Sequence, residues 1–318
     1  MKRLTSIAEL PSLDAPVHLA LGVFDGVHLG HQAVIARAVN AARRDGGSAG
    51  VLTFDPYPMW VLAPEKAPRR LLASLDHKAD ILADFGVDFL LALPFNQEQA
   101  KVRGEHFVQA LVDAGTRTIC AGEDWRFGHR REGDRQLLGS LAATMNFRFE
   151  AVAPVMMGGD RISSTRIRQA IRDGNLDDAS RMLGRRYTVA GTVVEGQKLG
   201  RTIGFPTANL ERGDEQYPPD GVWAVRASID GVTSDGVANL GIRPTVDAQS
   251  RLLEVHLFDE QEDLYGRKME VEFVRRIRDQ QRFDSLDALK RQIARDCQAA
   301  RAVLDEHRES PGGPSEGT

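Results

Sequence analysis

Residues 17–31 read VHLALGVFDGVHLGH, which contains a strand-like run, a turn and the start of a helix-like segment. The first eight residues, 17–24, form a largely apolar run, which is typical of a strand buried on both faces. Glycines follow, and the residues near 30–44 have the amphipathic spacing of a helix. This order predicts one unit of a parallel α/β sheet.

The same alternation continues to about residue 155. Strands separated by helices predict a parallel sheet covered on both faces, and ligands of such sheets bind at the carboxyl ends of the strands. We therefore expect a Rossmann-like α/β domain in the first half of the chain. Its further strands are expected at 50–54, 88–93, 117–121 and 147–153, and its further helices near 75–85, 104–114 and 134–145.

The pattern changes near residue 186, after two short helical segments at about 164–172 and 176–183. The stretches that follow alternate in polarity or are β-branched, and Asp230-Gly231 is a tight-turn signal. With no long helical pattern between them, they predict a compact antiparallel β-barrel. The strands are expected at 187–194, 222–229, 252–258 and 269–275, and a final helix at about 285–304.

These patterns predict a domain at 1–185, a second at 186–306 and a disordered tail at 307–318. The length of 318 residues agrees with this, since a domain has roughly 150 residues. The net charge of −4 excludes bulk electrostatic attraction to nucleic acid or to an anionic membrane. No apolar run approaches the roughly 18 residues that cross a bilayer, and the start lacks the apolar core of a signal peptide.

The cysteine content is low. Cys120 lies in an expected buried strand and Cys297 on the apolar stripe of the last helix, so both are expected to be core residues. Two cysteines cannot form a disulfide framework or a cysteine-based zinc site. Together with the absence of an export signal, this predicts a cytoplasmic protein.

The turn after the first strand carries the first chemical motif, His28-Leu29-Gly30-His31. Glycines let the backbone approach a ligand, and a helix N-terminus offers free N–H groups to an anion. Two histidines three residues apart can face one pocket and donate to phosphate oxygens. A surface loop with incidental histidines is the alternative, and it would be favoured for either histidine alone.

A second motif, Ile162-Ser163-Ser164-Thr165-Arg166-Ile167-Arg168, closes the same half. Hydroxyl and guanidinium groups at a helix start can hold phosphates, although an N-cap alone would also explain the serines and the threonine. The two motifs, in this order at opposite ends of one α/β domain, resemble the signatures of the nucleotidylyltransferase superfamily. In that superfamily the His-x-Gly-His signature contacts ATP during attack on the α-phosphate.

Two further segments, 53–58 (TFDPYP) and 122–134, each follow an apolar strand. Turn chemistry alone could explain their glycines and prolines. With the flanking signatures, they resemble the FMN adenylyltransferase module of bacterial riboflavin kinase/FAD synthetases. Tyr57 stands where that family usually has histidine, so we assign no proton-transfer role there. Class I aminoacyl-tRNA synthetases share the first signature, but their Lys-Met-Ser-Lys motif is absent, as is a Walker-type loop.

The expected barrel opens with residues 191–209, GTVVEGQKLGRTIGFPTAN. Its glycines allow a loop to wrap phosphates with backbone N–H groups, and the oxygens of Thr207 and Asn209 can reach one Mg²⁺. Taken by itself, the string would more simply be a glycine-rich hairpin. It nevertheless resembles the Pro-Thr-Ala-Asn signature of riboflavin kinases.

The stretch 252–258, LLEVHLF, alternates so that Glu254 and His256 share the polar face. A glutamate on the solvated face of a strand is the simpler interpretation. The resemblance to riboflavin kinases implies that Glu254 is the general base for the ribityl 5′-hydroxyl. The string 239–245, NLGIRPT, also fits that family, and Arg278 and Phe283 are implied to contact the flavin.

The resemblance covers about residues 17–305 and implies a bifunctional enzyme. The barrel would phosphorylate riboflavin with ATP to give FMN and ADP, and the α/β domain would adenylylate FMN with ATP to give FAD and pyrophosphate. His28, His31 and Glu254 are the expected catalytic residues, and Thr207 and Asn209 the expected Mg²⁺ ligands. The expected nucleotide and phosphate contacts are Gly22, Phe24, Asp124, Arg161, Ser163, Ser164, Thr165, Arg168, Gly191, Gly196, Gly200, Arg201 and Gly204.

Two other function classes are weighed against this one. A single-activity nucleotidylyltransferase with an accessory barrel would not need Thr207, Asn209 and Glu254. A non-catalytic flavin-binding protein would not need both histidines. The expected partners are riboflavin, FMN or FAD, and ATP, with Mg²⁺ as cofactor, no nucleic acid and no membrane. Self-association, if any, is expected to be a weak or transient homo-oligomer.

Overall fold

The computed structural model describes residues 1–318 except 14, 197–198, 212, 245–248, 259–263 and 310–318. The chain divides into two compact units. The first contains Met1–Ile167 and Met182–Gly184, and the second contains Arg168–Arg181 and the chain from Arg185 onward. The domain boundary near residue 186 stays a prediction, because helical residues between 168 and 184 are shared between the units.

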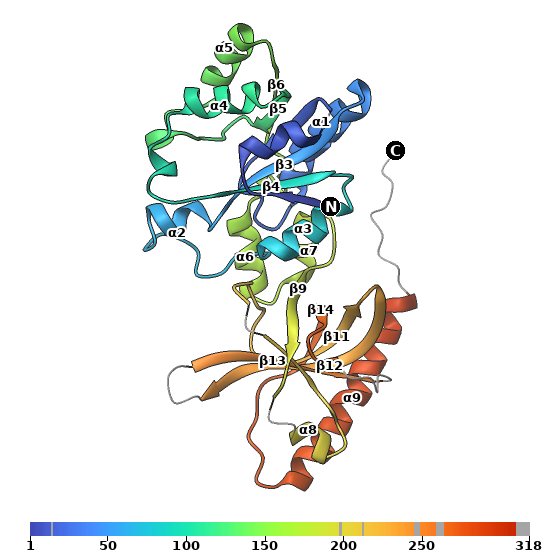
Figure 1. Ribbon diagram of the computed structural model, residues 1–318. Helices are drawn as coiled ribbons and strands as arrows, with labels where there is room; N and C mark the ends of the chain where they lie inside the picture. Colours follow the sequence, from blue (N-terminus) through green and yellow to red (C-terminus); the bar gives the residue numbers. More distant parts are fainter. Residues whose placement is uncertain (14, 197–198, 212, 245–248, 259–263, 310–318) are drawn as a thin grey trace. The chain divides into compact units, whose positions relative to one another are not determined.

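The first unit is built on a six-stranded parallel sheet (Figure 1). The strands that the sequence predicted are confirmed, and a short additional strand at the start of the chain pairs with the edge of the sheet. Across the sheet the order is β1 (Lys2–Leu4), β4 (Phe89–Pro94), β3 (Ser48–Asp55), β2 (Val17–Leu21), β5 (Thr116–Gly122) and β6 (Arg148–Val152).

Helices cover both faces of this sheet. Because successive strand residues point to opposite faces, one strand contributes side chains to two separate cores. Leu19 and Leu21 of β2 pack into one core with α4 (Gly104–Asp113), α5 (Arg135–Met145) and the 3₁₀ helix η1 (Ile7–Leu13). Ala20 packs into the other core with α1 (Leu29–Asp45) and α3 (Leu75–Ala83). The remaining elements before the barrel are α2 (Pro58–Leu62), η2 (Gln99–Lys101), η3 (His129–Arg131), β7 (Met156–Met157), β8 (Asp160–Arg161), α6 (Ser164–Arg172) and α7 (Leu176–Leu183). Most residues of α6 and α7 belong to the second unit.

The strand order places a topological switch point between β2 and β5. From β2 the chain proceeds through β3 and β4 on one side of the sheet, and then returns to β5 and β6 on the other side. In open α/β sheets the crevice outside the carboxyl ends of such strands is where ligands bind. The turn after β2 carries His28 and His31, so the histidines lie at this switch point.

The second unit is a closed antiparallel barrel, as the sequence predicted. Two of its strands, β10 and β12, were not predicted. The strand order is β10 (Ala208–Leu210), β13 (Gln249–Leu257), β12 (Val232–Pro244), β11 (Gly221–Ile229), β14 (Lys268–Arg278) and β9 (Thr188–Val194), with the short helix α8 (Leu199–Thr202) between β9 and β10.

The last helix, α9 (Leu286–Glu309), packs on the outside of β11, β12 and β14 (Figure 1). Ala300 and Leu304 of α9 are fully buried against Val222, Ala224 and Val237. The helix continues to Glu309, so residues 307–309, which were expected in the tail, are helical. Residues 310–318 lie outside the described part of the chain. Among the described residues no helix is both long and apolar enough to cross a membrane.

Candidate active sites

The loop between β2 and α1 has an unusual backbone. Phe24 has a φ of 53° and Val27 a φ of 43°, although neither residue is a glycine. A positive φ is a strained conformation for a β-branched residue, and it persists only where the surroundings hold it. The loop that carries the histidines is therefore held in place by its neighbours.

Hydrogen bonds from distant segments provide this support. The Asp25 carboxylate accepts a bond from the backbone N–H of Leu72 at 2.7 Å, and the Asp25 carbonyl accepts one from Ser164 Oγ at 2.9 Å. The Gln32 side chain donates to the Val27 carbonyl at 2.8 Å. Ser164, which was expected to contact phosphate, thus contacts the backbone of the histidine loop.

A buried lysine adds a further support. Lys78 of α3 is 4% exposed, and its ammonium group donates to the Val23 carbonyl at 2.8 Å and lies 3.5 Å from Thr53 Oγ1. Burial lowers the pKa of Lys78, and the negative charges of Asp25 and Asp55 act in the opposite direction. One ammonium group therefore joins the carboxyl ends of β2 and β3.

His28 and His31 lie together at the start of α1. Their rings are stacked, with centroids 3.5 Å apart. His28 is the N-cap of the helix, and its Nδ1 accepts a bond from the His31 backbone N–H at 3.3 Å. Because Nδ1 accepts, a neutral His28 carries its proton on Nε2, which can then donate to an anion. The positive end of the α1 dipole favours an anion at the same place.

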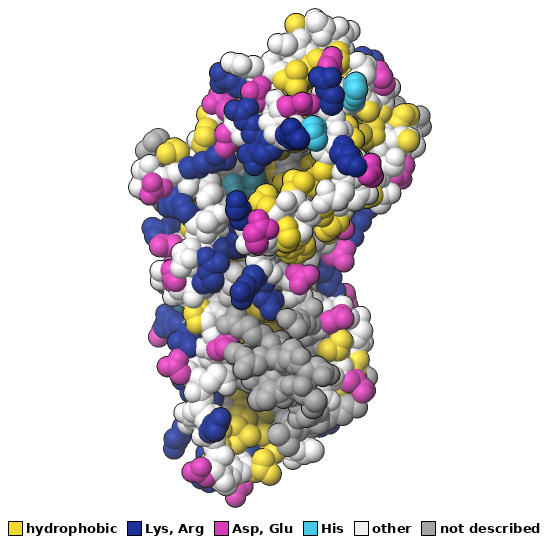
Figure 2. Space-filling model, turned by 90° about the vertical axis from the view of Figure 1, so that its left-hand side faces the viewer, with side chains coloured by type: hydrophobic (Ala, Val, Ile, Leu, Met, Phe, Trp, Pro, Cys, Tyr) yellow, Lys and Arg dark blue, Asp and Glu magenta, His cyan; other side chains and the backbone are white. Residues whose placement is uncertain are grey.

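Both histidines line a cavity of about 940 Å³ in the first unit. Gly22, Phe24 and Tyr57 line it as well, and Tyr57 packs edge-to-face on Trp60 with ring centroids 5.9 Å apart. Figure 2 shows hydrophobic side chains exposed in the N-terminal unit, in the upper part of the view, with Lys and Arg side chains around them. The aromatic side chains of the lining are Phe24, Phe54, Tyr57, Phe95, Phe107, Trp125 and Phe127.

The charged side chains of this lining are mostly basic. Among the described lining residues Asp124 is the only acid, and its carboxylate forms an ion pair with Arg161. Two residues expected to contact nucleotide are thereby brought together from distant segments. Such a lining favours a ligand that is negatively charged and has a flat apolar part. The basic side chains are Lys66, Lys101, Arg126, Arg130, Arg131 and Arg161.

Other residues of the second motif do not line this cavity. Ser163, at the start of α6, accepts a bond from the backbone N–H of Arg166 at 3.3 Å, as an N-cap does. Arg168 is buried on the same helix. The cavity lining contains neither these residues nor Ser164 and Thr165, so their contact with phosphate stays a prediction.

In the barrel, three polar residues lie in one row across neighbouring strands. Asn209 of β10 is in register with Glu254 of β13, and Glu254 is in register with Asn239 of β12. Residues in register share one face of a sheet. Leu253 and Val255 are fully buried on the opposite face, which confirms the alternation predicted for this strand.

The expected metal ligands lie next to two of the glycines. The Asn209 side chain is buried, and a Cβ on Gly196 would lie 2.2 Å from its Nδ2, so the Gly196 backbone packs directly on this amide. A Cβ on Gly200 would lie 3.3 Å from Thr207 Oγ1. Gln197 and Lys198 of this loop lie outside the described residues.

The remaining glycines and Arg201 are less closely associated with this row. Gly191 is part of β9 and pairs with Met269, so it belongs to the strand. Gly204 has a φ of 90°, and Arg201 is exposed on α8. Their contacts with phosphate stay predictions.

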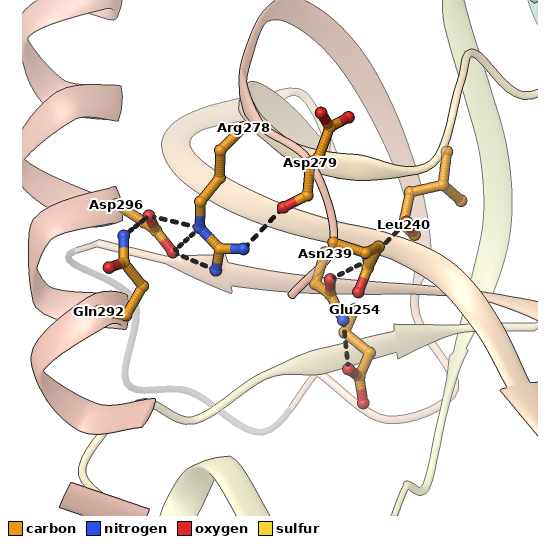
Figure 3. Close-up of polar contacts among 8 residues, drawn as sticks. Asn239, Leu240, Glu254, Arg278, Asp279, Gln292 and Asp296 are labelled. Carbon is orange, nitrogen blue, oxygen red and sulfur yellow. Dashed lines mark hydrogen bonds and ion pairs between the residues drawn. The ribbon is translucent and has the colours of Figure 1, made fainter. Parts of the chain in front are cut away.

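Glu254 has a polar neighbour in Asn239, the first residue of the string 239–245. The Asn239 side chain donates from Nδ2 to Glu254 Oε2 at 3.2 Å (Figure 3). Gln280 in turn donates to Asn239 Oδ1 at 2.7 Å. The strand patterns gave no signal for this contact, because Asn239 and Gln280 are far apart in the sequence and meet only in the folded barrel.

Arg278, expected to contact flavin, is held by α9. Its guanidinium forms a forked ion pair with the buried Asp296, with N–O distances of 2.7–3.1 Å (Figure 3). Gln292 also donates to Asp296, at 2.9 Å. The Arg278 guanidinium lies 5.7 Å from the centre of the Phe283 ring, which brings the two expected flavin contacts together.

Comparison with known proteins connects both units to one enzyme family. Residues 11–166 match the family model of FAD synthetase, and residues 183–304 match that of riboflavin kinase. A bifunctional riboflavin kinase/FMN adenylyltransferase of Pseudomonas fluorescens is 42% identical over 286 residues, covering 89% of this chain and 91% of that protein. The protein of the same name from Listeria monocytogenes is 39% identical, covering 90% of this chain and 92% of its own length. The chain belongs to the family of bifunctional riboflavin kinase/FMN adenylyltransferases.

A solved structure also resembles this member of the family. The crystal structure of a protein named macrolide-efflux protein, from Streptococcus pneumoniae, has a TM-score of 0.77 and 35% sequence identity. The match covers 90% of this chain and 93% of that chain. The two family models and the relatives confirm the predicted enzyme class, and the parallel sheet followed by the barrel confirms the predicted fold class.

Both cysteines pack in hydrophobic clusters, as expected for core residues. Cys120 is fully buried in β5, and burial raises the pKa of its thiol to about 12. Cys297 is half-buried on α9, and burial raises the pKa of its thiol to about 11. A thiol must ionise to act as a nucleophile, so neither is suited to covalent catalysis.

Most of the basic residues of the cavity were not expected from the sequence. Arg126, Arg130 and Arg131 follow the apolar strand β5, and three arginines and a histidine within six residues are a signal for an anion site. Lys66 and Lys101 gave no such signal, because isolated surface lysines are common. The bonds of Lys78 also had no sequence signal, since a lysine on an amphipathic helix is normally solvated.

Proposed function

We propose that the barrel transfers the γ-phosphate of ATP to riboflavin, giving FMN and ADP. The N-terminal unit then joins FMN to the AMP portion of a second ATP, giving FAD and pyrophosphate. The cavity of the N-terminal unit carries the proposal. Its basic side chains suit the phosphates of two substrates, and its aromatic rings suit a flavin or adenine.

For the adenylyl transfer, we propose that the enzyme acts through hydrogen-bond donors and positive charge. The phosphate of FMN is already a nucleophile, so this step needs no strong base. His28 and His31 would donate to the reacting phosphates, where charge accumulates on the α-phosphate and on the leaving pyrophosphate. Arg161 would contact the leaving pyrophosphate. Ser163, Thr165 and Arg168 stay proposed contacts of the same group.

For the kinase step, we propose Glu254 as the general base. Its Oε1 would accept the proton of the ribityl hydroxyl as the hydroxyl oxygen bonds to the γ-phosphorus and the bond to ADP breaks. A positioned base contributes about 10²–10⁴-fold to such a rate. The row of Asn209, Glu254 and Asn239 supports this role, because it places amides beside the carboxylate.

We propose that Thr207 and Asn209 hold Mg²⁺ beside the phosphates. The Asn209 Oδ1 is buried and has no hydrogen-bond partner among the described residues, and amide oxygens are ligands that Mg²⁺ accepts. Among these residues no group of three or more His, Cys, Asp or Glu could hold a metal. With so few protein ligands, a Mg²⁺ site in which substrate phosphates supply the other ligands fits these residues. When bound, Mg²⁺ would neutralise charge on the phosphates.

The cellular setting is also proposed. We propose a cytoplasmic enzyme whose partners are its substrates and products, without nucleic acid or membrane. Self-association, if any, is proposed to be weak or transient.

The proposal is tested by incubating the protein with riboflavin, ATP and Mg²⁺ and separating riboflavin, FMN and FAD by chromatography over time. Glu254→Gln should slow FMN formation by about 10²–10⁴-fold and leave conversion of supplied FMN to FAD intact. His28→Asn should do the reverse, and asparagine keeps an N-cap for α1. If either variant lost both reactions while still folded, the assignment of the two reactions to two separate sites would be wrong.

A further inference from the structure

The amide of Asn239 faces the Glu254 carboxylate, and its orientation matters. An asparagine side chain can present either its NH₂ group or its carbonyl oxygen to a neighbour. The NH₂ group donates to a carboxylate, whereas the oxygen repels it. In the structure Nδ2 faces Glu254 Oε2, at 3.2 Å. A further contact favours the same orientation.

Gln280 provides that contact. Its Nε2 donates both to the Leu240 backbone carbonyl at 2.8 Å and to Asn239 Oδ1 at 2.7 Å. A backbone carbonyl only accepts hydrogen bonds, so Leu240 requires the NH₂ group of Gln280 on that side. That group then faces Asn239 and requires its oxygen. The Asn239 NH₂ group is left for Glu254.

The surroundings hold Gln280 at this position. A Cβ on Gly241 would lie 2.7 Å from Gln280 Nε2, so the glycine leaves room for this side chain. Two residues earlier, Arg278 is paired with Asp296 of α9 and donates to the Asp279 carbonyl at 2.8 Å (Figure 3). The segment that carries Gln280 is therefore attached to the last helix.

We propose that Gln280 is a positioning residue for riboflavin phosphorylation. It orients the Asn239 amide, which holds Oε2 of Glu254 and leaves Oε1 to accept the hydroxyl proton. The proposal rests on the proposed role of Glu254 as the base. A hydrogen bond to a carboxylate is stronger than one between neutral groups, so reversing the amide replaces a strong attraction with repulsion.

The test is Gln280→Glu, which keeps the shape of the side chain and removes its donors. The new carboxylate draws the Asn239 NH₂ group toward itself and turns the amide oxygen toward Glu254. We expect kcat for FMN formation to fall by about tenfold or more, because the variant loses part of the rate that a well-positioned base contributes. The KM for riboflavin should change little. Gln281→Glu is the matched control, because it adds the same charge at the next, exposed residue and should keep the wild-type kcat.

A double-mutant cycle separates positioning from a general structural role. If Gln280 acts through Asn239, Gln280→Glu should cause little further loss in an Asn239→Ala background. If the fold-loss in kcat of the double variant equalled the product of the fold-losses of the two single variants, the proposal would be overturned. Circular dichroism of each variant reports whether the barrel is folded, and conversion of FMN to FAD, measured on the same samples, reports whether the N-terminal unit stays active.

A second variant covers the case in which Gln280→Glu does not fold. Gly241→Ala displaces the Gln280 amide without adding charge, and it should also lower kcat for FMN formation. If Gln280→Glu and Gly241→Ala both fold and both keep the wild-type kcat, or if the only one that folds keeps it, the positioning role is refuted. Glu254→Gln distinguishes the two failures. If Glu254→Gln also kept the wild-type rate of FMN formation, the assignment of Glu254 as the general base would be wrong. If Glu254→Gln were inactive while Gln280→Glu kept the wild-type rate, only the positioning role of Gln280 would be wrong.

Discussion

Lys78 shows how one buried charge supports a reactive loop. Its ammonium donates to the Val23 carbonyl just before the residues with positive φ, and it has little access to water. Removing water from a charge is costly unless other groups replace it. The carbonyl and the nearby carboxylates provide that replacement. The position of the histidines therefore depends on a residue that lies on another helix.

Lys78→Met should disturb this loop. The Val23 carbonyl loses a charged donor, so we expect the unfolding free energy of the N-terminal unit to fall by about 2 kcal/mol in urea denaturation. Formation of FAD from FMN should fall as well, because His28 and His31 shift, while formation of FMN is unaffected. Lys2→Met, an exposed lysine of the same unit, is the control. An unchanged rate of FAD formation would show that the loop does not need this support.

The short strand β10 places Asn209 beside Glu254 in the proposed kinase site. Only three residues long, it pairs with β9 on one side and β13 on the other, which brings Asn209 beside Glu254. The Gly196 backbone then packs on the Asn209 amide. The arrangement leaves no room for a larger residue at position 196.

Gly196→Ala should displace the Asn209 amide. A misplacement of about 1 Å can cost on the order of 10²-fold in rate, so we expect a loss of that size in FMN formation. The Mg²⁺ concentration needed for half-maximal activity should rise, which a magnesium titration measures. Conversion of FMN to FAD serves as the internal control. A normal magnesium requirement in the variant would contradict a role for Asn209 at the metal.

The missed strands show what sequence patterns can and cannot predict about elements. The strands β2, β3 and β4 of the parallel sheet were predictable because they are largely buried and their sequences are largely apolar. β12 was missed because its polar and glycine residues follow no clear alternation, and β10 because three residues are too short a pattern. Both strands are stabilised by pairing with neighbours, which a local pattern does not reveal.

The site residues divide in the same way. His28, His31 and Glu254 could be chosen as candidates from motifs, because each motif is contiguous in the chain. Asn239 and Gln280 act on Glu254 across the barrel, and their contacts depend on strand register. Only the folded structure brings them together.

In the molecule as a whole, each proposed reaction belongs to its own compact unit. Each unit has its own hydrophobic core, and each carries its own set of candidate catalytic residues. FMN is the product of one reaction and the substrate of the other. If it is released between them, the two reactions need not occur on the same polypeptide.

Mixing two variants tests this separation. Glu254→Gln alone and His28→Asn alone should each fail to convert riboflavin to FAD. Mixed together they should restore FAD, after a lag that shortens as the concentration of both proteins rises. Chromatography over time measures the lag. Failure to form FAD, with each remaining single-step activity intact, would mean that FMN is not passed between molecules.

The first strand has a consequence for how the protein is made. Lys2 of β1 pairs with Phe89 of β4, so during translation β1 must wait for a partner that is synthesised much later. Until then Leu4, which is 2% exposed in the finished protein, has no core to enter. β1 therefore reaches its native neighbour only after the central strands β2 and β3 have been translated, so this border of the sheet is completed after its centre.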